Sequence, residues 1–135
     1  MKKITLLLCL SLLTLGCGND DDSGGGEPNV SGNWSLIRVT GGISGADNTF
    51  PQGLIRWNFQ NGILTIQNNN TSNEADMFAS GMYEYSVREN QGDYFLFIDN
   101  RDQGIMEINL IQLVVNGAKH FDGQCDDCFN FILTK

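Results

Sequence analysis

The sequence predicts an all-β protein: a single small up-and-down antiparallel β-barrel of about eight strands at residues 31–135, behind a flexible N-terminal tether. Three observations support this class. The 135-residue chain holds 16 glycines and only 2 prolines. Its apolar residues alternate with polar ones in short runs, and turn-forming pairs rich in Gly, Asn and Asp separate these runs. Alternation with a period of two is typical of strands buried on one face, and such strands joined by turns indicate an antiparallel sheet or barrel.

The N-terminal segment, residues 1–16, has the organisation of a lipoprotein signal peptide. Lys2 and Lys3 precede an apolar run that is too short to cross a bilayer as a helix. Cys17 follows a small residue, and this junction resembles the lipobox of bacterial lipoproteins, in which the cysteine thiol is acylated. The resemblance predicts lipidation at Cys17. The alternative is an ordinary cleaved leader, since Thr14 stands where the lipobox has a large aliphatic residue.

Residues 17–30 are predicted to form the acylated tether. Asp20, Asp21 and Asp22 closely follow Cys17, and Ser23 to Gly26 have the composition of a flexible linker. The aspartates resemble the acidic export signal behind the lipidated cysteine of Bacteroidetes lipoproteins, which directs a protein to the cell surface. The resemblance implies an outer-membrane lipid anchor with the barrel at the cell surface, and the periplasmic face is the alternative.

The charge balance excludes several partners. The whole chain has 8 basic and 16 acidic residues, and loss of Lys2 and Lys3 with the leader leaves a net charge of −10. Such a chain repels nucleic acid and anionic lipid headgroups, so we expect membrane contact only through the lipid on Cys17. About 105 residues remain for the folded part, which is enough for one core.

The first strand begins with Gly32 and Trp34. A glycine two places before a tryptophan, at the start of the first strand, resembles the Gly-x-Trp signature of lipocalins and bacterial lipocalin-like domains. The resemblance implies a calycin barrel in which Gly32 and Trp34 close one end. The family also stacks an arginine on this tryptophan, and here Arg38 or Lys135 are the candidates for that place.

The next segments form a predicted loop and a hairpin. Residues 41–53 are rich in glycine and are expected to lie as a loop over the barrel mouth. Ile55, Trp57 and Phe59 alternate with polar residues on a strand buried on one side. Asn61-Gly62 then predicts a type I′ turn into a strand at residues 63–67.

Residues 68–80 are a polar segment with room for one helical turn around residues 74–78. Met77 and Phe78 are its notable apolar residues. They are expected to plug the barrel, and the alternative is that they form a lid over a ligand.

The second half of the domain continues the strand pattern. A strand that begins at Gly81 is followed by a turn at residues 89–93 and by a strand at 94–98 that is apolar on both faces. Such a strand is either central or lines a cavity on one side. A turn is expected at residues 99–104.

Residues 105–115 form either one long strand or two strands separated near Asn109-Leu110, the split that the lipocalin-like resemblance favours. Ile111, Leu113 and Val115 are expected to share a face. The last strand, residues 128–135, is expected to pair with the first and close the barrel.

The predicted inner face suggests two functions. An eight-stranded barrel is either filled by its own side chains or holds one small ligand. We therefore expect an envelope-anchored module that binds a small apolar or amphipathic ligand. The alternative is a filled structural or protein-interaction accessory of the envelope, such as an inhibitor. The candidate ligand-binding residues are Trp57, Phe59, Tyr83, Tyr85, Phe95, Phe97, Phe129 and Phe131.

The remaining candidate chemistry lies near the C-terminus. Cys125 and Cys128 are expected to form a disulfide because the export route is oxidising. The alternatives are free thiols, or a zinc site completed by His120 and Asp126 or Asp127. His120 is the single histidine, and the sequence has neither a nucleophile elbow nor a glycine loop before a helix. We therefore expect no enzyme, no cofactor and no metal.

Overall fold

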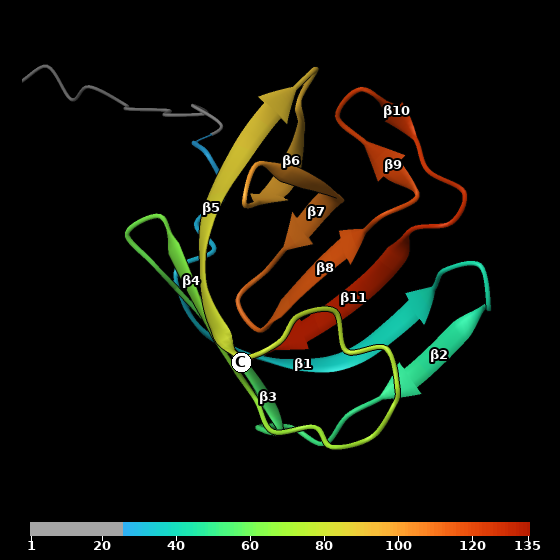
Figure 1. Ribbon diagram of the computed structural model, residues 1–135. Coiled ribbons are helices and arrows are strands. Elements are labelled where there is room, and N and C mark those ends of the chain that lie inside the picture. The colour runs from blue at the N-terminus through green and yellow to red at the C-terminus, as the bar shows by residue number, and fades with distance from the viewer. Residues whose placement is uncertain (1–25) are drawn as a thin grey trace, which may run out of the picture.

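The computed structural model describes residues 26–135 (Figure 1). The predicted signal peptide, Cys17 and most of the tether lie outside the described residues. The regular structure of the described part is entirely β. Its strands are β1 (Gly32–Gly41), β2 (Ala46–Thr49), β3 (Ile55–Gln60), β4 (Ile63–Asn68), β5 (Gly81–Asn90), β6 (Asp93–Ile98), β7 (Arg101–Ile108), β8 (Gln112–Asn116), β9 (Lys119–His120), β10 (Gly123–Gln124) and β11 (Phe129–Thr134). Within residues 26–135 no helix is long and apolar enough to cross a membrane.

Eight of these strands close an antiparallel barrel. Neighbours pair in the order β1, β3, β4, β5, β6, β7, β8 and β11, and β11 pairs back with β1 from Ser35 to Gly41. Closure leaves no free sheet edge in the barrel wall. The structure therefore confirms the predicted all-β, up-and-down barrel, including the pairing of its last strand with its first.

Two short additions sit on this wall. β2 pairs with the second half of β1, beyond the stretch of β1 that pairs with β3. β9 and β10 form a small separate hairpin that packs against β7 and stands outside the barrel (Figure 1). The prediction that residues 41–53 are all loop is thus wrong at Ala46–Thr49. β2 is held by backbone pairing with β1 from Arg38 to Gly41, and Arg38 also donates to both carboxylate oxygens of Asp47, at 2.9 Å each.

Three tight turns connect neighbouring strands of the wall. Each has two central residues with positive φ, as a type I′ turn requires, and this geometry matches the twist of the strands it joins. The predicted hairpin at Asn61-Gly62 is confirmed. The expected turn at residues 99–104 is shorter than predicted, because β7 already begins at Arg101. The three central pairs are Asn61-Gly62, Gln91-Gly92 and Asp99-Asn100.

The helical turn expected at residues 74–78 is absent. The side-chain amides of Asn68 and Asn70 both donate to the same Asp76 carboxylate oxygen, at 2.9 and 3.0 Å. Asn68 also donates to the carbonyl of Phe78 at 2.9 Å. Met77 lies at φ 73°, outside the helical region. These side-chain hydrogen bonds fix the segment as an irregular loop, so helix propensity does not decide its shape.

Residues 105–115 contain two strands, as the lipocalin-like spacing favoured. β7 ends at Ile108, β8 begins at Gln112, and the turn between them includes Ile111. Ile111 is 68% exposed, whereas Leu113 and Val115 are fully buried. The prediction that Ile111 shares a face with Leu113 and Val115 is wrong, because the chain turns before the strand pattern begins.

Candidate functional site

The barrel interior is filled by its own side chains. Its strands contribute fifteen apolar residues to one cluster, and none of them is more than 5% exposed. Rings and branched aliphatic groups interdigitate there, as in the core of any close-packed protein. These residues are Trp34, Leu36, Val39, Ile55, Trp57, Phe59, Leu64, Ile66, Leu96, Ile98, Met106, Leu113, Val115, Phe131 and Leu133.

Trp57 is the centre of the aromatic part of this interior. Its ring lies 6.1 Å from that of Phe59 and 5.5 Å from those of Phe78 and Phe131. Such tilted and edge-on arrangements are the favourable ones for aromatic pairs. The indole Nε1 of Trp57 is buried and has no hydrogen-bond partner among the described residues.

The other predicted interior residues divide into two groups. Tyr83, Tyr85 and Phe129 are half-buried and pack against the cluster, as expected for the inner face. Tyr85 meets Phe59 edge-on, with ring centroids 4.9 Å apart. Six of the eight candidate ligand-binding residues therefore line or touch the interior, although the space between them is occupied by protein.

Phe95 and Phe97 form the second group, and their predicted position on the inner face is wrong. Leu96 and Ile98 of β6 belong to the interior cluster, so the alternate residues of that strand point outward. Phe121, from the β9–β10 hairpin, covers both outer rings, with centroids 5.5 and 5.9 Å away. β6 is apolar on both faces because a distant hairpin lies over its outer face.

Trp34 lies near the start of β1, at the end of the barrel that we call the closed end. Its indole Nε1 donates to the carbonyl of Val30 at 2.8 Å, and Val30 is itself only 3% exposed. The Nζ of Lys135 lies 4.7 Å from the centre of the Trp34 ring, a cation–π contact. Of the two candidates for the stacking cation, the structure selects Lys135. Gly32 lies at φ 120°, a conformation that glycine adopts readily.

The opposite end, which we call the mouth, is covered by the loop at residues 69–80. Phe78 reaches from this loop onto Trp57 and also packs on Tyr83, with ring centroids 5.4 Å apart. Asn48 of β2 donates to the carbonyl of Ala75 at 3.3 Å and ties the loop to the first hairpin. Phe78 therefore plugs the barrel, as expected.

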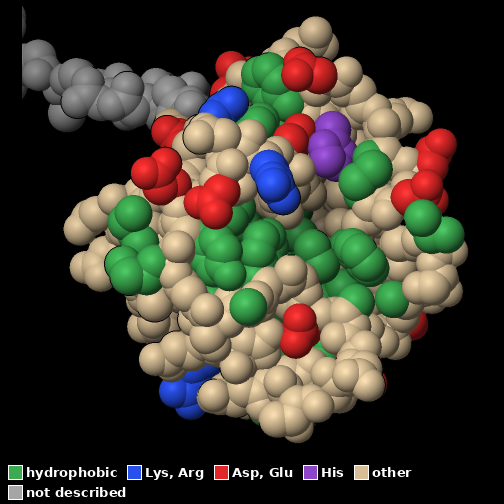
Figure 2. Space-filling model, in the orientation of Figure 1, with side chains coloured by type: hydrophobic (Ala, Val, Ile, Leu, Met, Phe, Trp, Pro, Cys, Tyr) green, Lys and Arg blue, Asp and Glu red, His purple; other side chains and the backbone are tan. Residues whose placement is uncertain are grey.

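The mouth also presents apolar side chains to solvent. Met77, Phe78 and Phe129 are only half-buried, and Ile43 in the turn between β1 and β2 is 89% exposed. Figure 2 shows hydrophobic side chains gathered in the middle of the face that carries this loop, surrounded by polar ones. At the rim, the hydrogen bonds from Arg38 lower the pKa of the Asp47 carboxyl below its ordinary value of 3.8.

A polar hollow of about 570 Å³ lies on the outer wall near the closed end. Its lining comes from the outward positions of β1, β3 and β4, where Asn58 donates to Asn33 at 2.6 Å. No sequence motif marks this hollow. Among the residues that line it are Asn33, Arg56, Asn58, Thr65, Gln67 and Lys135.

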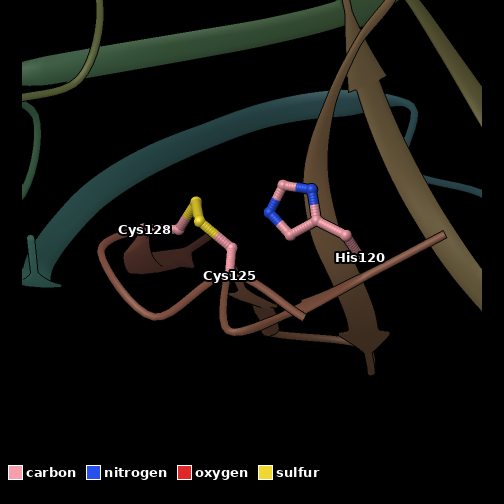
Figure 3. A group of neighbouring side chains, drawn as sticks. All are labelled: His120, Cys125 and Cys128. Carbon is pink, nitrogen blue, oxygen red and sulfur yellow. A yellow bond between two sulfur atoms is a disulfide. The ribbon is translucent and has the colours of Figure 1, made fainter. Parts of the chain in front are cut away.

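The cysteine pair lies beside the hairpin, outside the barrel. Cys125 and Cys128 form the predicted disulfide, with their Cα atoms 5.6 Å apart. His120 on β9 points its ring toward this disulfide (Figure 3). Asp126 and Asp127, the carboxylates considered for a zinc site, are both exposed. Asp102 on β7 is the carboxylate beside His120, with 3.4 Å between its Oδ2 and the imidazole Nδ1.

Two residues of this region, Asp102 and Phe121, have no signal in the sequence. Asp102 was assigned to a turn, and no local pattern marks its approach to His120 eighteen positions later in the chain. Phe121 follows the single histidine in a segment without a strand pattern.

Comparison with protein-family models, with curated proteins and with solved structures found no significant match. The lipocalin-like relationship thus stays a prediction from the Gly-x-Trp motif.

Proposed function

We propose that this protein is a lipid-anchored module of the cell envelope that binds a protein partner through the mouth of its barrel. The observation that carries the proposal is the filled interior, to which the strands contribute fifteen buried apolar side chains. A barrel whose inside is a packed core acts as a rigid scaffold for its surface. Function is then carried by the loops at its ends.

The composition of the mouth fits a protein interface. Aromatic residues and methionine are enriched at such interfaces, and exposed apolar groups surrounded by polar ones mark interaction sites. Met77, Phe78 and Phe129 supply large apolar groups that are partly exposed, and Ile43 adds one that is 89% exposed. Asn48 and Asp76 hold the loop that presents them, so little conformational entropy is lost on docking.

The position of the N-terminus agrees with this orientation. The chain enters the barrel through Val30, which packs beside Trp34 at the closed end. A lipid on Cys17 would therefore be tethered to the closed end, so that the attachment point does not obstruct the mouth. The acidic export signal at Asp20 to Asp22 supports placing this anchor on the outer membrane, at the cell surface.

Site-specific photo-crosslinking in intact cells tests the proposal. A photoreactive amino acid at Ile43 should give a discrete adduct of defined mass, and Met77→Glu in the same chain should abolish that adduct. The same photoreactive group at Thr65, in the polar hollow of the outer wall, is the matched control and should give none. An equal adduct from both positions, or one that survives Met77→Glu, contradicts binding through the mouth.

Trp57 favours a second candidate function, the binding of a small amphipathic ligand. Its buried Nε1 lacks an acceptor among residues 26–135, and Phe78 of the loop lies edge-on to its ring, with centroids 5.5 Å apart. A ligand that displaced Phe78 could supply the missing acceptor. Native mass spectrometry of the full chain after incubation with a cell extract should then show a bound small molecule. A chain that emerges empty, both as wild type and as Phe78→Ala, excludes this candidate.

A further inference from the structure

His120, Cys125 and Cys128 form a cluster that the proposed function does not use. One ligand atom from each residue lies within 4.8 Å of the others, and all three residues are partly buried. Two cysteines separated by two residues are a common chelating pair in structural zinc sites, and histidine is their usual companion. In the oxidised protein the two sulfurs are bonded to each other, so the cluster can only coordinate a metal after reduction.

The imidazole is oriented as a ligand. Its Nδ1 faces the Asp102 carboxylate at 3.4 Å, while its Nε2 points toward the disulfide (Figure 3). This Nε2 is buried and has no hydrogen-bond partner within the described part of the chain. A carboxylate beside one ring nitrogen favours the tautomer with its proton on Nδ1, which leaves the Nε2 lone pair free for a metal. Leaving that nitrogen buried without a partner is otherwise unfavourable.

Asp102 is itself held in place. Its Oδ1 accepts from the backbone N–H of Gly104 at 2.8 Å, and its Oδ2 accepts from the N–H of Phe121 at 2.5 Å. The second bond links the carboxylate to the residue that follows His120. Asp102 therefore positions β9 and the imidazole together, as the outer partner of a metal-ligating histidine does.

The cysteine backbones are fixed independently of the disulfide. The N–H of Cys125 donates to the carbonyl of Ala118 at 3.1 Å, and the carbonyl of Cys128 accepts from Gly42 at 3.2 Å. Gly41 and Gly117 pack so closely that an added Cβ would lie 2.5 Å from the Cys128 carbonyl oxygen and 2.1 Å from that of Phe129, respectively. These contacts keep the two sulfurs near His120 after the bond between them is broken.

We propose that reduction of the Cys125–Cys128 disulfide converts this cluster into a zinc-binding site, so that the hairpin responds to redox state. Two equivalents of a small thiol reduce the bond, which yields two cysteine thiols and one oxidised disulfide of the reductant. A surface hollow of about 540 Å³ lined by His120 and Asp126 gives small molecules access to this region. Zn²⁺ then displaces one proton from each thiol to solvent and binds both thiolates and His120 Nε2, with a fourth position left for water.

Equilibrium dialysis of the full chain against Zn²⁺, followed by metal analysis, tests this site. Chain reduced with a small thiol under anaerobic conditions should bind one more Zn²⁺ per chain than oxidised chain. The Cys125→Ser/Cys128→Ser variant is the matched control because it keeps Cys9 and Cys17, so any zinc at those thiols cancels in the comparison. Equal zinc in the reduced wild type and in this variant overturns the proposal.

The histidine and aspartate are tested separately in the reduced chain. His120→Gln should weaken Zn²⁺ binding more than the roughly 10- to 100-fold expected for loss of an orienting partner. Asp102→Asn should weaken it within that range while leaving the sulfur-to-metal absorption band of the Co²⁺ form in place. Circular dichroism of each variant checks that the barrel is retained. Unchanged affinity in a folded His120→Gln chain overturns the assignment of His120 as a ligand.

Discussion

The barrel interior and the β9–β10 hairpin both bury aromatic rings, but they hold them in different ways. In the interior, Trp57 of β3 and Phe131 of β11 lie in a continuous ladder of eight paired strands and contact each other across the barrel wall, with ring centroids 5.5 Å apart. Outside, Phe121 covers Phe95 and Phe97 from a hairpin of two short strands. The interior therefore depends on the whole fold, whereas the hairpin depends on a few local attachments.

Those attachments are polar. Asp102 accepts from the N–H of Phe121, Asn90 donates to the Phe121 carbonyl at 3.0 Å, and Lys119 pairs with Asp93. The disulfide closes the segment that follows the hairpin. Because of this difference, we expect packing in the interior to determine the free energy of unfolding of the protein. The hairpin is then the element that can change its conformation while the barrel remains folded. Three substitutions test the comparison, from the largest expected effect to the smallest.

Phe131→Ala should cause the largest loss in the free energy of unfolding. The side chain is fully buried and contacts the ring of Trp57, and removal of such a ring from a core costs about 3–5 kcal/mol. Urea unfolding of the variant and the wild type measures the difference. Ile43→Ala removes an exposed aliphatic group of the mouth and should change stability by less than about 0.5 kcal/mol. A loss below about 1 kcal/mol in Phe131→Ala would show that the interior is not a packed core.

Phe121→Ala should cause an intermediate loss in the free energy of unfolding. It uncovers the outer rings of Phe95 and Phe97, but Phe121 is itself only partly buried, so we expect a loss of about 1–3 kcal/mol. Hydrogen exchange should show faster exchange at Phe95 and Phe97 and in the hairpin, with little change at Leu64. Arg88, which lies 3.9 Å over the Phe97 ring, retains one contact there. Faster exchange throughout the barrel would contradict the separation of the two regions.

Asp47→Asn should have the smallest effect on the free energy of unfolding, because both partners of the Arg38–Asp47 pair are exposed to solvent. Arg38 lowers the pKa of Asp47, so the pair stabilises the folded state above the ordinary pKa of 3.8 and loses this contribution as the pH falls through the lower folded value. Urea midpoints of wild type and variant should therefore differ slightly at neutral pH and converge in acid. A difference that grows as the pH falls would contradict this sign.

The sequence by itself determined the local features of this fold. The alternation at Ile55, Trp57 and Phe59 predicts a strand buried on one side, and the turn at Asn61-Gly62 predicts the hairpin, because strand period and positive φ are properties of a few neighbouring residues. The Cys125–Cys128 disulfide is also a local feature, since only two residues separate the cysteines. The Gly-x-Trp motif predicts a closing role for Trp34, which is buried and donates a hydrogen bond to Val30.

Only the tertiary structure decided which side of β6 faces inward. Alternation shows that Phe95 and Phe97 share a face, but both faces of the strand are apolar, so the pattern holds no information about which one is inside. The β9–β10 hairpin, more than twenty positions later, covers the outer face. The loop at residues 69–80 is irregular for a different reason, because side-chain hydrogen bonds from Asn68 and Asn70 to Asp76 outweigh helix propensity.

The approach of His120 to Asp102 and to the cysteine pair is likewise tertiary. These groups come from β7, β9 and the segment after β10, and their meeting depends on how the hairpin folds back over the barrel wall. The sequence identifies these side chains, but the distances between them depend on long-range packing, which no local pattern predicts. Composition and motifs therefore identify a barrel with a cysteine pair, and the closed barrel decides which residues surround that pair.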